Sequence, residues 1–212
     1  MPSTPVKPEK GNGMLHVIGE ICGFIGGAIG IATGVPQMLR IRKLGHAQGL
    51  ALSPWILMVF QFAAWTAFGY RVGSPSILFA NLLTFFTTAL VVTAVKGNNF
   101  KNWALIMLAG IATGAFVIYG PTAVTDIAMI VLTASRLPQL IRTWINRATA
   151  QVTAVSISSL VVSLSSMAFW MAFAILTENP LVVATTSVAI SITLATAVLE
   201  NNIARRAASV SA

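Results

Sequence analysis

The sequence predicts an all-α membrane protein with seven transmembrane helices. Of its 212 residues, 56% are hydrophobic and 8% are charged, whereas a globular domain carries about 25% charged residues. The mean hydropathy is +0.83, and the apolar residues form long continuous runs. Such runs are typical of helices, which need about 20 apolar residues to cross the hydrocarbon. Transmembrane strands would instead alternate polar and apolar residues over about ten positions.

Seven runs approach the length that a membrane-spanning helix needs. In order, they cover roughly residues 14–37, 50–71, 75–95, 103–119, 121–141, 152–176 and 180–199. Residues 1–13, MPSTPVKPEKGNG, are rich in Pro, Lys and Gly and predict a disordered extracytoplasmic tail. This tail does not resemble the start of a cleaved signal peptide, so we expect the first run to be retained as a helix.

The placement of the basic residues predicts the orientation of these helices. A formal charge of +8 could indicate a nucleic-acid partner, but the charges follow the topology, so no nucleic acid is predicted. Nine basic residues fall on one side, namely Arg40, Arg42, Lys43, Lys96, Lys101, Arg142, Arg147, Arg205 and Arg206, and three on the other, namely Lys7, Lys10 and Arg71. By the positive-inside rule the N-terminus is outside and the C-terminus cytoplasmic, in a plasma (inner) membrane.

Several classes of site are not supported by the residues. The single cysteine, Cys22, excludes an internal disulfide, and no Cys/His metal cluster exists. His16 and His46 lie near predicted membrane edges, and no nucleophile–base arrangement accompanies them. Every lysine is in the tail or a loop, so no retinal Schiff base is expected. The sequence therefore predicts no enzyme, cofactor or metal site.

Two motifs occur twice at matching distances. PQMLR at 36–40 aligns with PQLIR at 138–142 at an offset of 102, and WTAFGYRVGSP at 65–75 aligns with WMAFAILTENP at 170–180 at an offset of 105. The chain thus repeats spans 1–3 as spans 5–7. Because three is an odd number, the fourth span is needed to insert both copies in the same sense. The predicted fold is therefore two parallel three-helix repeats joined by a linker helix (3+1+3), related by an axis along the membrane normal.

This plan divides the chain into a first repeat at 14–95, a linker helix with its flanks at 96–120, a second repeat at 121–203 and a cytoplasmic tail at 204–212. The sequence resembles the PQ-loop superfamily, in particular the SWEET and SemiSWEET sugar transporters. Its most specific shared features are the doubled Pro-Gln-x-x-Arg and Trp65 followed sixteen residues later by Asn81. The resemblance covers about residues 14–203 and implies an outside N-terminus and transport by alternating access.

The prolines of the repeated motif are candidate hinges, together with the glutamines that follow them: Pro36, Gln37, Pro138, Gln139 and also Pro54. Proline lacks an N–H and clashes with the carbonyl one turn back, which weakens the helix locally. The resemblance implies that these prolines let each repeat rock, with the glutamines bonding freed backbone groups. The alternative is that they end helices at the membrane boundary. Pro54 has no counterpart in the second repeat, where Ser156-Ile157-Ser158 stands.

A set of polar and aromatic residues lies at one predicted depth, about 9 Å below the outer rim. It comprises Glu20, Trp65, Asn81, Asp126, Trp170 and Thr186. Polar groups at this depth need a cavity or one another. The resemblance implies that Trp65 and Trp170 stack a sugar ring, with Asn81 and Thr186 at the positions of two hydrogen-bonding asparagines. Thr186 departs from that pattern, and the tryptophans could alternatively be interfacial belt residues.

Three charged residues within the spans are candidate coupling or charge sites: Glu20, Asp126 and Arg136. Asp126 and Arg136 are ten residues apart on one helix, about 15 Å along its axis, and so cannot pair directly. An intramembrane acid suggests proton coupling or binding of a charged group, and an arginine could hold a carboxylate. The alternatives are structural pairing with other helices for Asp126 and Arg136, and snorkelling to the surface for Glu20.

Glycines of the first span, Gly19, Gly23, Gly26, Gly27, Gly30 and Gly34, have small-xxx-small spacings that permit close helix packing or a sliding interface. Together these features predict a transporter of a small polar solute, sugar-like by resemblance. A proton-coupled transporter of an amino acid or another charged metabolite is one alternative. A non-transporting membrane receptor or assembly partner is another. The expected partners are the solute and the lipid bilayer, and the sequence leaves open whether the chain forms a homo-oligomer.

Overall fold

A computed structural model describes residues 10–44, 52–147 and 157–210, and the side chains within 13–32, 55–145 and 160–203, together with Arg147, Arg205 and Arg206. Its helices are α1 (Lys10–Leu44), α2 (Leu52–Val72), α3 (Pro75–Lys96), α4 (Phe100–Tyr119), α5 (Thr122–Thr133), η1 (Ala134–Arg136), α6 (Leu137–Asn146), α7 (Ile157–Leu176) and α8 (Pro180–Val210). The segments α5, η1 and α6 form one span, so each predicted span is helical over the residues that the structure describes. The all-α fold with seven spans is confirmed.

The length and apolarity of the helices confirm an integral membrane protein. Five stretches are long and apolar enough to cross a membrane, namely Gly13–Ala32, Pro75–Lys96, Phe100–Tyr119, Thr122–Ile145 and Pro180–Ile203, and Leu160–Leu176 is a shorter apolar helix. Two helices extend beyond the predicted spans. α1 begins at Lys10, within the predicted disordered tail, and α8 continues to Val210. An apolar run marks the hydrocarbon thickness, whereas a helix extends as far as its backbone hydrogen bonds continue.

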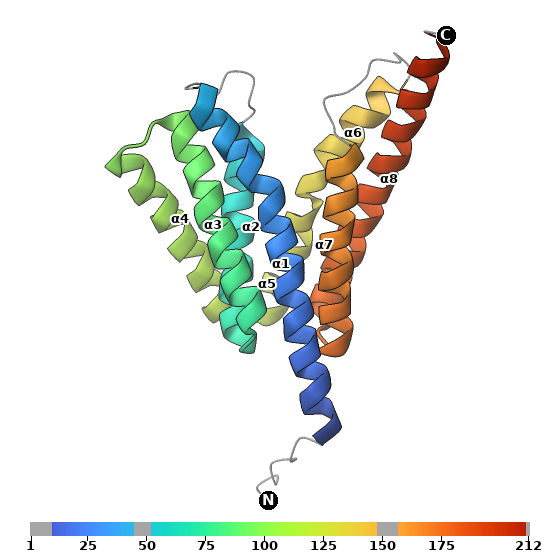
Figure 1. Cartoon of the computed structure of the whole chain (residues 1–212). Helices are drawn as coiled ribbons and strands as arrows, with labels where there is room; N and C mark the ends of the chain where they lie inside the picture. The colour runs from blue at the N-terminus through green and yellow to red at the C-terminus, as the bar shows by residue number, and fades with distance from the viewer. Residues whose placement is uncertain (1–9, 45–51, 148–156, 211–212) are drawn as a thin grey trace, which may run out of the picture.

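Each repeat has its third helix between the other two. α3 packs against α1 and α2, and α8 packs against α7 and against α5 and α6, while α4 lies on α2 and α3. The start of α1 and the 73–74 turn lie at one end of the molecule, here called the N-side, and the C-terminus lies at the other, the C-side (Figure 1). One group, α2, α3 and α4, and the other, α6, α7 and α8, lie close together at the N-side and separate toward the C-side (Figure 1).

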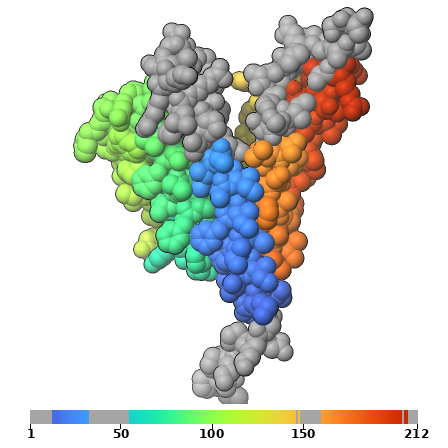
Figure 2. Space-filling model, viewed as in Figure 1, coloured from blue at the N-terminus to red at the C-terminus, as the bar shows by residue number. Residues whose placement is uncertain are grey.

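Two seams join the repeats. The first runs between α1 and α7 and is the most extensive helix contact in the described part of the chain, and Figure 2 shows the two helices in continuous surface contact. The second, between α2 and α5, is far smaller. Ser166 of α7 donates a hydrogen bond of 2.7 Å to the Gly26 carbonyl across the first seam. Only small residues on α1 leave a neighbouring helix room for such an approach.

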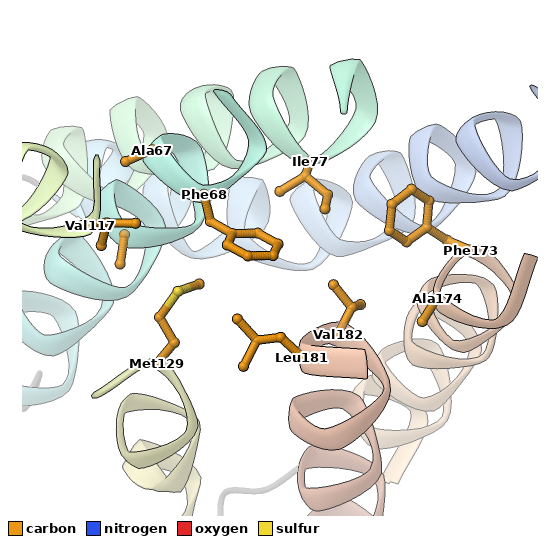
Figure 3. Close-up of a cluster of buried hydrophobic side chains, with 10 residues drawn as sticks. Ala67, Phe68, Ile77, Val117, Met129, Phe173, Ala174, Leu181 and Val182 are labelled. Carbon is orange, nitrogen blue, oxygen red and sulfur yellow. The ribbon is translucent and has the colours of Figure 1, made fainter. Parts of the chain in front are cut away.

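An apolar cluster, the N-side plug, closes the N-side end of the interface. It consists of Ala64, Ala67, Phe68, Ile77, Val117, Met129, Phe173, Ala174, Leu181 and Val182. Figure 3 shows these side chains converging from both repeats, with Phe68 and Ile77 opposite Leu181 and Val182. Phe173 and Ile77 are each 1% exposed, so the plug is packed as a protein interior. It separates the space between the repeats from the N-side surface.

Candidate functional site

A cavity of about 130 Å³, here called the central cavity, lies between the repeats beside the plug. Four predicted site residues line it: Trp65, Asn81, Trp170 and Thr186. The lining also includes Gln61, Phe62, Ile77, Thr133, Arg136, Met167, Val182, Thr185 and Ala189. Because Ile77 and Val182 also belong to the plug, the plug forms the N-side wall of the cavity.

The two tryptophans occupy matching positions in the two repeats. Trp65 meets Phe68 edge to face with ring centroids 5.5 Å apart, and Trp170 meets Phe173 in the same way, also at 5.5 Å. In each pair the tryptophan lines the cavity and the phenylalanine belongs to the plug. The repeated Trp-x-Ala-Phe sequence therefore places one ring at the cavity and the next in the plug. An edge-to-face pair of this kind contributes about 0.5–1.5 kcal/mol beyond its buried area.

The polar residues that line the cavity with the tryptophans differ between the repeats. Asn81 donates a hydrogen bond of 2.7 Å from Nδ2 to the Ile77 carbonyl of its own helix. Its Oδ1 has no bond within the described residues and is available as an acceptor. Thr186, the matching residue, has 8% of its surface exposed. Gln61, one turn before Trp65 on the same face of α2, also lines the cavity. The sequence reasoning missed Gln61, although that spacing could have indicated it.

A second cavity of about 380 Å³, the C-side cavity, continues from the first. It shares Phe62, Asn81, Arg136, Met167 and Trp170 with the central cavity. Its other lining residues, including Trp55, Thr88, Val91 and Ser163, lie progressively nearer the C-side along their helices. The two cavities therefore form one passage, lined by apolar and polar side chains, that begins at the plug and runs toward the C-side.

The second Pro-Gln motif interrupts its helix. α5 ends at Thr133, a 3-10 turn covers Ala134–Arg136, and α6 begins at Leu137. Pro138 has no N–H for the carbonyl one turn back, and the Ala134 carbonyl instead accepts from the N–H of Leu137. The Gln139 amide donates to Thr143 at 3.3 Å, not to freed backbone, and Thr143 donates to Glu200 at 2.7 Å.

The first Pro-Gln motif differs from the second. α1 is a continuous α-helix from Lys10 to Leu44 and so runs through Pro36 without interruption. The side chains of Pro36, Gln37 and Pro54 lie outside the residues whose side chains are described. The two motifs therefore differ in backbone structure, since the helix is interrupted beside Pro138 and continuous at Pro36, and the hinge role of both motifs stays a prediction.

The predicted single polar layer is divided into two levels. Glu20 and Asp126 do not line the central cavity; they line a separate N-side pocket beyond the plug, with Phe68, Phe173 and Leu181. The expectation of one common depth for all six residues is thus wrong. The distance of a residue from the end of an apolar run does not determine which cavity its side chain faces, and both acids are held by partners at the N-side.

Asp126 and Glu20 each have partners at the N-side. Asp126 forms an ion pair of 2.9 Å with Arg71 of α2, and Arg71 also donates to the Val117 carbonyl and to Thr125. Glu20 accepts hydrogen bonds from the Ser74 hydroxyl at 2.7 Å and from the Ser76 N–H at 2.8 Å. A carboxylate at this position compensates unpaired N–H groups at the start of α3.

Arg136 ends the 3-10 turn and lines both cavities. Within the described residues its guanidinium makes no hydrogen bond and no ion pair. As expected from their spacing, Arg136 and Asp126 do not contact each other. Among the described lining residues, Arg136 is therefore the charged group of the passage, while Glu20 and Asp126 line the N-side pocket.

The chain matches no protein-family model and no curated protein sequence. It does match the solved structure of a eukaryotic SWEET transporter, with a TM-score of 0.72 over 91% of this chain and 99% of that one, at 9% sequence identity. At this low sequence identity, the match shows a similarity of fold, that is, of the arrangement of the helices along nearly the whole of both chains. The doubled Pro-Gln motif, the 3+1+3 helix plan and this superposition agree: the chain has the SWEET, or PQ-loop, fold.

Proposed function

We propose that the protein is a transporter that carries a small polar solute across the membrane by alternating access. The observation that carries the proposal is the passage itself. A cavity lined by two tryptophans and several polar groups lies between two repeats, is walled by the apolar plug at the N-side and continues toward the C-side. A transporter needs such a site, with access from one side at a time.

In this proposal Trp65 and Trp170 pack against the solute, and Asn81 and Thr186 form hydrogen bonds with it. A ring with hydroxyl groups fits such a lining, because aromatic faces accept its C–H surface and polar groups fix its orientation. A sugar-like solute is supported by the SWEET fold. The positive-inside distribution supports a cytoplasmic C-side, and a reporter fused after residue 206 should read cytoplasmic.

Two alternatives of the sequence reasoning receive different support. Proton coupling through Asp126 is less well supported, because Asp126 forms an ion pair of 2.9 Å with Arg71 and so has a structural role between two helices. A receptor that does not transport would not need a passage that continues to the C-side. Both alternatives predict measurements different from those of a facilitated carrier, so one assay separates them.

The experiment is uptake into proteoliposomes containing the purified full chain, with a panel of radiolabelled sugars, amino acids and organic acids, with and without a pH gradient. We expect uptake of at least one solute, and loss of at least tenfold in Asn81→Ala. Asn201→Ala is the matched control, since Asn201 is an exposed amide on α8. Equal uptake by Asn81→Ala and wild type would count against a solute site in the central cavity. Binding without uptake would favour the receptor.

A further inference from the structure

Arg136 is a cation within a membrane span, and no described residue pairs with it. It lies in the stretch Thr122–Ile145, which is long and apolar enough to cross the membrane, and lines both parts of the passage. Its five N–H groups have no acceptor among the described residues. A charged side chain at this depth is costly unless it faces water, an opposite charge or a ligand. The position therefore needs an explanation beyond packing.

The acidic residues of the described chain do not neutralise Arg136. Asp126 is paired with Arg71, and Glu20 accepts from Ser74 and Ser76. Glu178 lies in the N-side pocket, and Glu200 accepts from Thr143. No aspartate or glutamate is among the described residues that line the central or the C-side cavity. Within the described residues, the passage thus has a positive charge without a negative one.

The repeat shows that this charge is not part of the shared helix plan. With the offset of 102 that aligns Pro36 with Pro138, Arg136 aligns with Gly34. One repeat therefore supplies a glycine where the other supplies a guanidinium. The 3-10 turn that ends at Arg136 exists only in the second repeat, since α1 is continuously α-helical. Charge and helix break coincide at the cavity.

We propose that the solute is a small hydroxylated organic anion whose carboxylate or phosphate is held by Arg136. This inference rests on the proposed function and specifies its solute. A guanidinium presents two parallel N–H groups that match both oxygens of a carboxylate or phosphate. The Asn81 Oδ1 accepts from a hydroxyl of the same solute, because Nδ2 is bound to the Ile77 carbonyl. Trp65 and Trp170 cover the apolar face of its ring.

The experiment compares three probes that differ by one group: glucose, glucuronate and glucose 6-phosphate. Their binding to the purified full chain in detergent is measured by isothermal titration calorimetry. We expect at least one anion to bind ten times or more tightly than glucose, and the tighter anion distinguishes carboxylate from phosphate. Arg136→Gln should reduce this preference to less than about twofold, because it removes both the positive charge and the two parallel N–H groups of the guanidinium.

Two further variants make the result specific. Arg142→Gln removes one positive charge from an exposed position on α6 that lines neither cavity, and should keep the full preference. Arg136→Lys keeps the positive charge but not the two parallel N–H groups, and should therefore keep a reduced preference. This variant tests the proposal even if Arg136→Gln does not fold. The proposal is overturned if glucose binds wild type as tightly as both anions, if no probe binds at millimolar concentration, or if the preference persists unchanged in Arg136→Gln or Arg136→Lys.

Transport of the tightest probe is measured separately in proteoliposomes. Preferential anion binding without uptake would contradict the proposed transport while supporting the anion site. Uptake of glucose without preference for either anion would support transport and contradict the anion site. The two proposals therefore fail in different measurements.

Discussion

The two seams between the repeats are equivalent by sequence but differ in how extensively their helices pack. The repeat relates α1 to α5–α6 and α2 to α7, so the α1–α7 seam and the α2–α5 seam are counterparts. The first is extensive and the second small. All sixteen glycines of the chain lie before residue 121, and residues 121–212 contain none. Close helix approach without glycine is difficult, which explains why one seam packs tightly.

The contacts in the two seams differ accordingly. A Cβ added to Gly26 would lie 3.1 Å from the Ser166 carbonyl and 3.2 Å from the Phe169 Cβ, so α1 rests directly on α7. The second seam contains part of the plug, where Phe68 of α2 and Met129 of α5 belong to one apolar cluster. It also has two polar pairs, with Arg71 bound to Asp126 at the N-side and Ser135 bound to Gln61 at 3.4 Å beside the cavity. Polar pairs can exchange partners with water or solute, whereas a packed helix face cannot. We therefore expect the first seam to act as a pivot and the second to open.

The largest expected effect comes from locking each seam with a disulfide, in a Cys22→Ser background that removes the single native cysteine. Gln61→Cys with Ser135→Cys should abolish transport on oxidation and recover on reduction, because it ties α2 to the 3-10 turn. Gly30→Cys with Ser166→Cys links the first seam, where a Cβ on Gly30 would lie 3.3 Å from the Ser166 Oγ. Its oxidation should change uptake by less than about twofold. Equal inhibition by both links would contradict a single pivot.

The next effect concerns packing in the first seam. Gly26→Val places a branched side chain against α7 backbone, and we expect a loss of about 2–3 kcal/mol or more in stability. Gly13→Val is the control, since a Cβ on Gly13 meets nothing within 4 Å. Thermal unfolding of both purified variants in one detergent provides the measurement. If Gly26→Val unfolds at the wild-type temperature, the seam does not depend on close approach.

A smaller effect is expected at the N-side of the second seam. Asp126→Asn leaves Arg71 bound to Thr125 and Val117 but removes its charge partner. Because Arg71 and Asp126 are 20% and 32% exposed, we expect a loss of about 1–2 kcal/mol, between the values for surface and buried pairs. Arg71→Gln and the double variant complete a mutant cycle, and a coupling near zero would show that the pair does not hold the seam. Disappearance of pH-driven uptake in Asp126→Asn would instead favour proton coupling.

Much of this architecture could be predicted from the sequence, for identifiable reasons. Long apolar runs determine spans, and a doubled motif with an odd number of helices requires a linker, so the 3+1+3 plan follows without any tertiary contact. Trp65, Asn81, Trp170 and Thr186 converge on one cavity because the repeat places them at one depth on equivalent helices. The internal repeat therefore allowed a local sequence pattern to predict that these four residues lie at one site.

The partners and directions of side chains outside that symmetry could not be predicted in this way. Arg71 was assigned only to the outer surface, but it pairs with Asp126, 55 positions away. Glu20 caps a different helix, and such long-range partners leave no periodic signal. The direction of Arg136 depends on a 3-10 turn, which changes the angular position of a side chain relative to a regular α-helix. A helical projection from residue 121 cannot include that change.

The smallest expected effect compares one hydroxyl in each seam. Ser166→Ala removes a buried 2.7 Å hydrogen bond to the Gly26 carbonyl and should cost about 1 kcal/mol of stability. Ser135→Ala removes the 3.4 Å contact with Gln61, which is near the limit of a hydrogen bond, and should cost less than about 0.5 kcal/mol. Both variants are compared by thermal unfolding, and Ser135→Ala also by uptake rate.

A contact that must break in every transport cycle has to be weak, since any stabilisation of the closed seam adds to the barrier for opening it. We therefore expect Ser135→Ala to keep or slightly raise the uptake rate despite this small loss of stability. If Ser135→Ala costs as much stability as Ser166→Ala, the second seam is held as firmly as the first, and the division into a pivot and an opening seam is wrong.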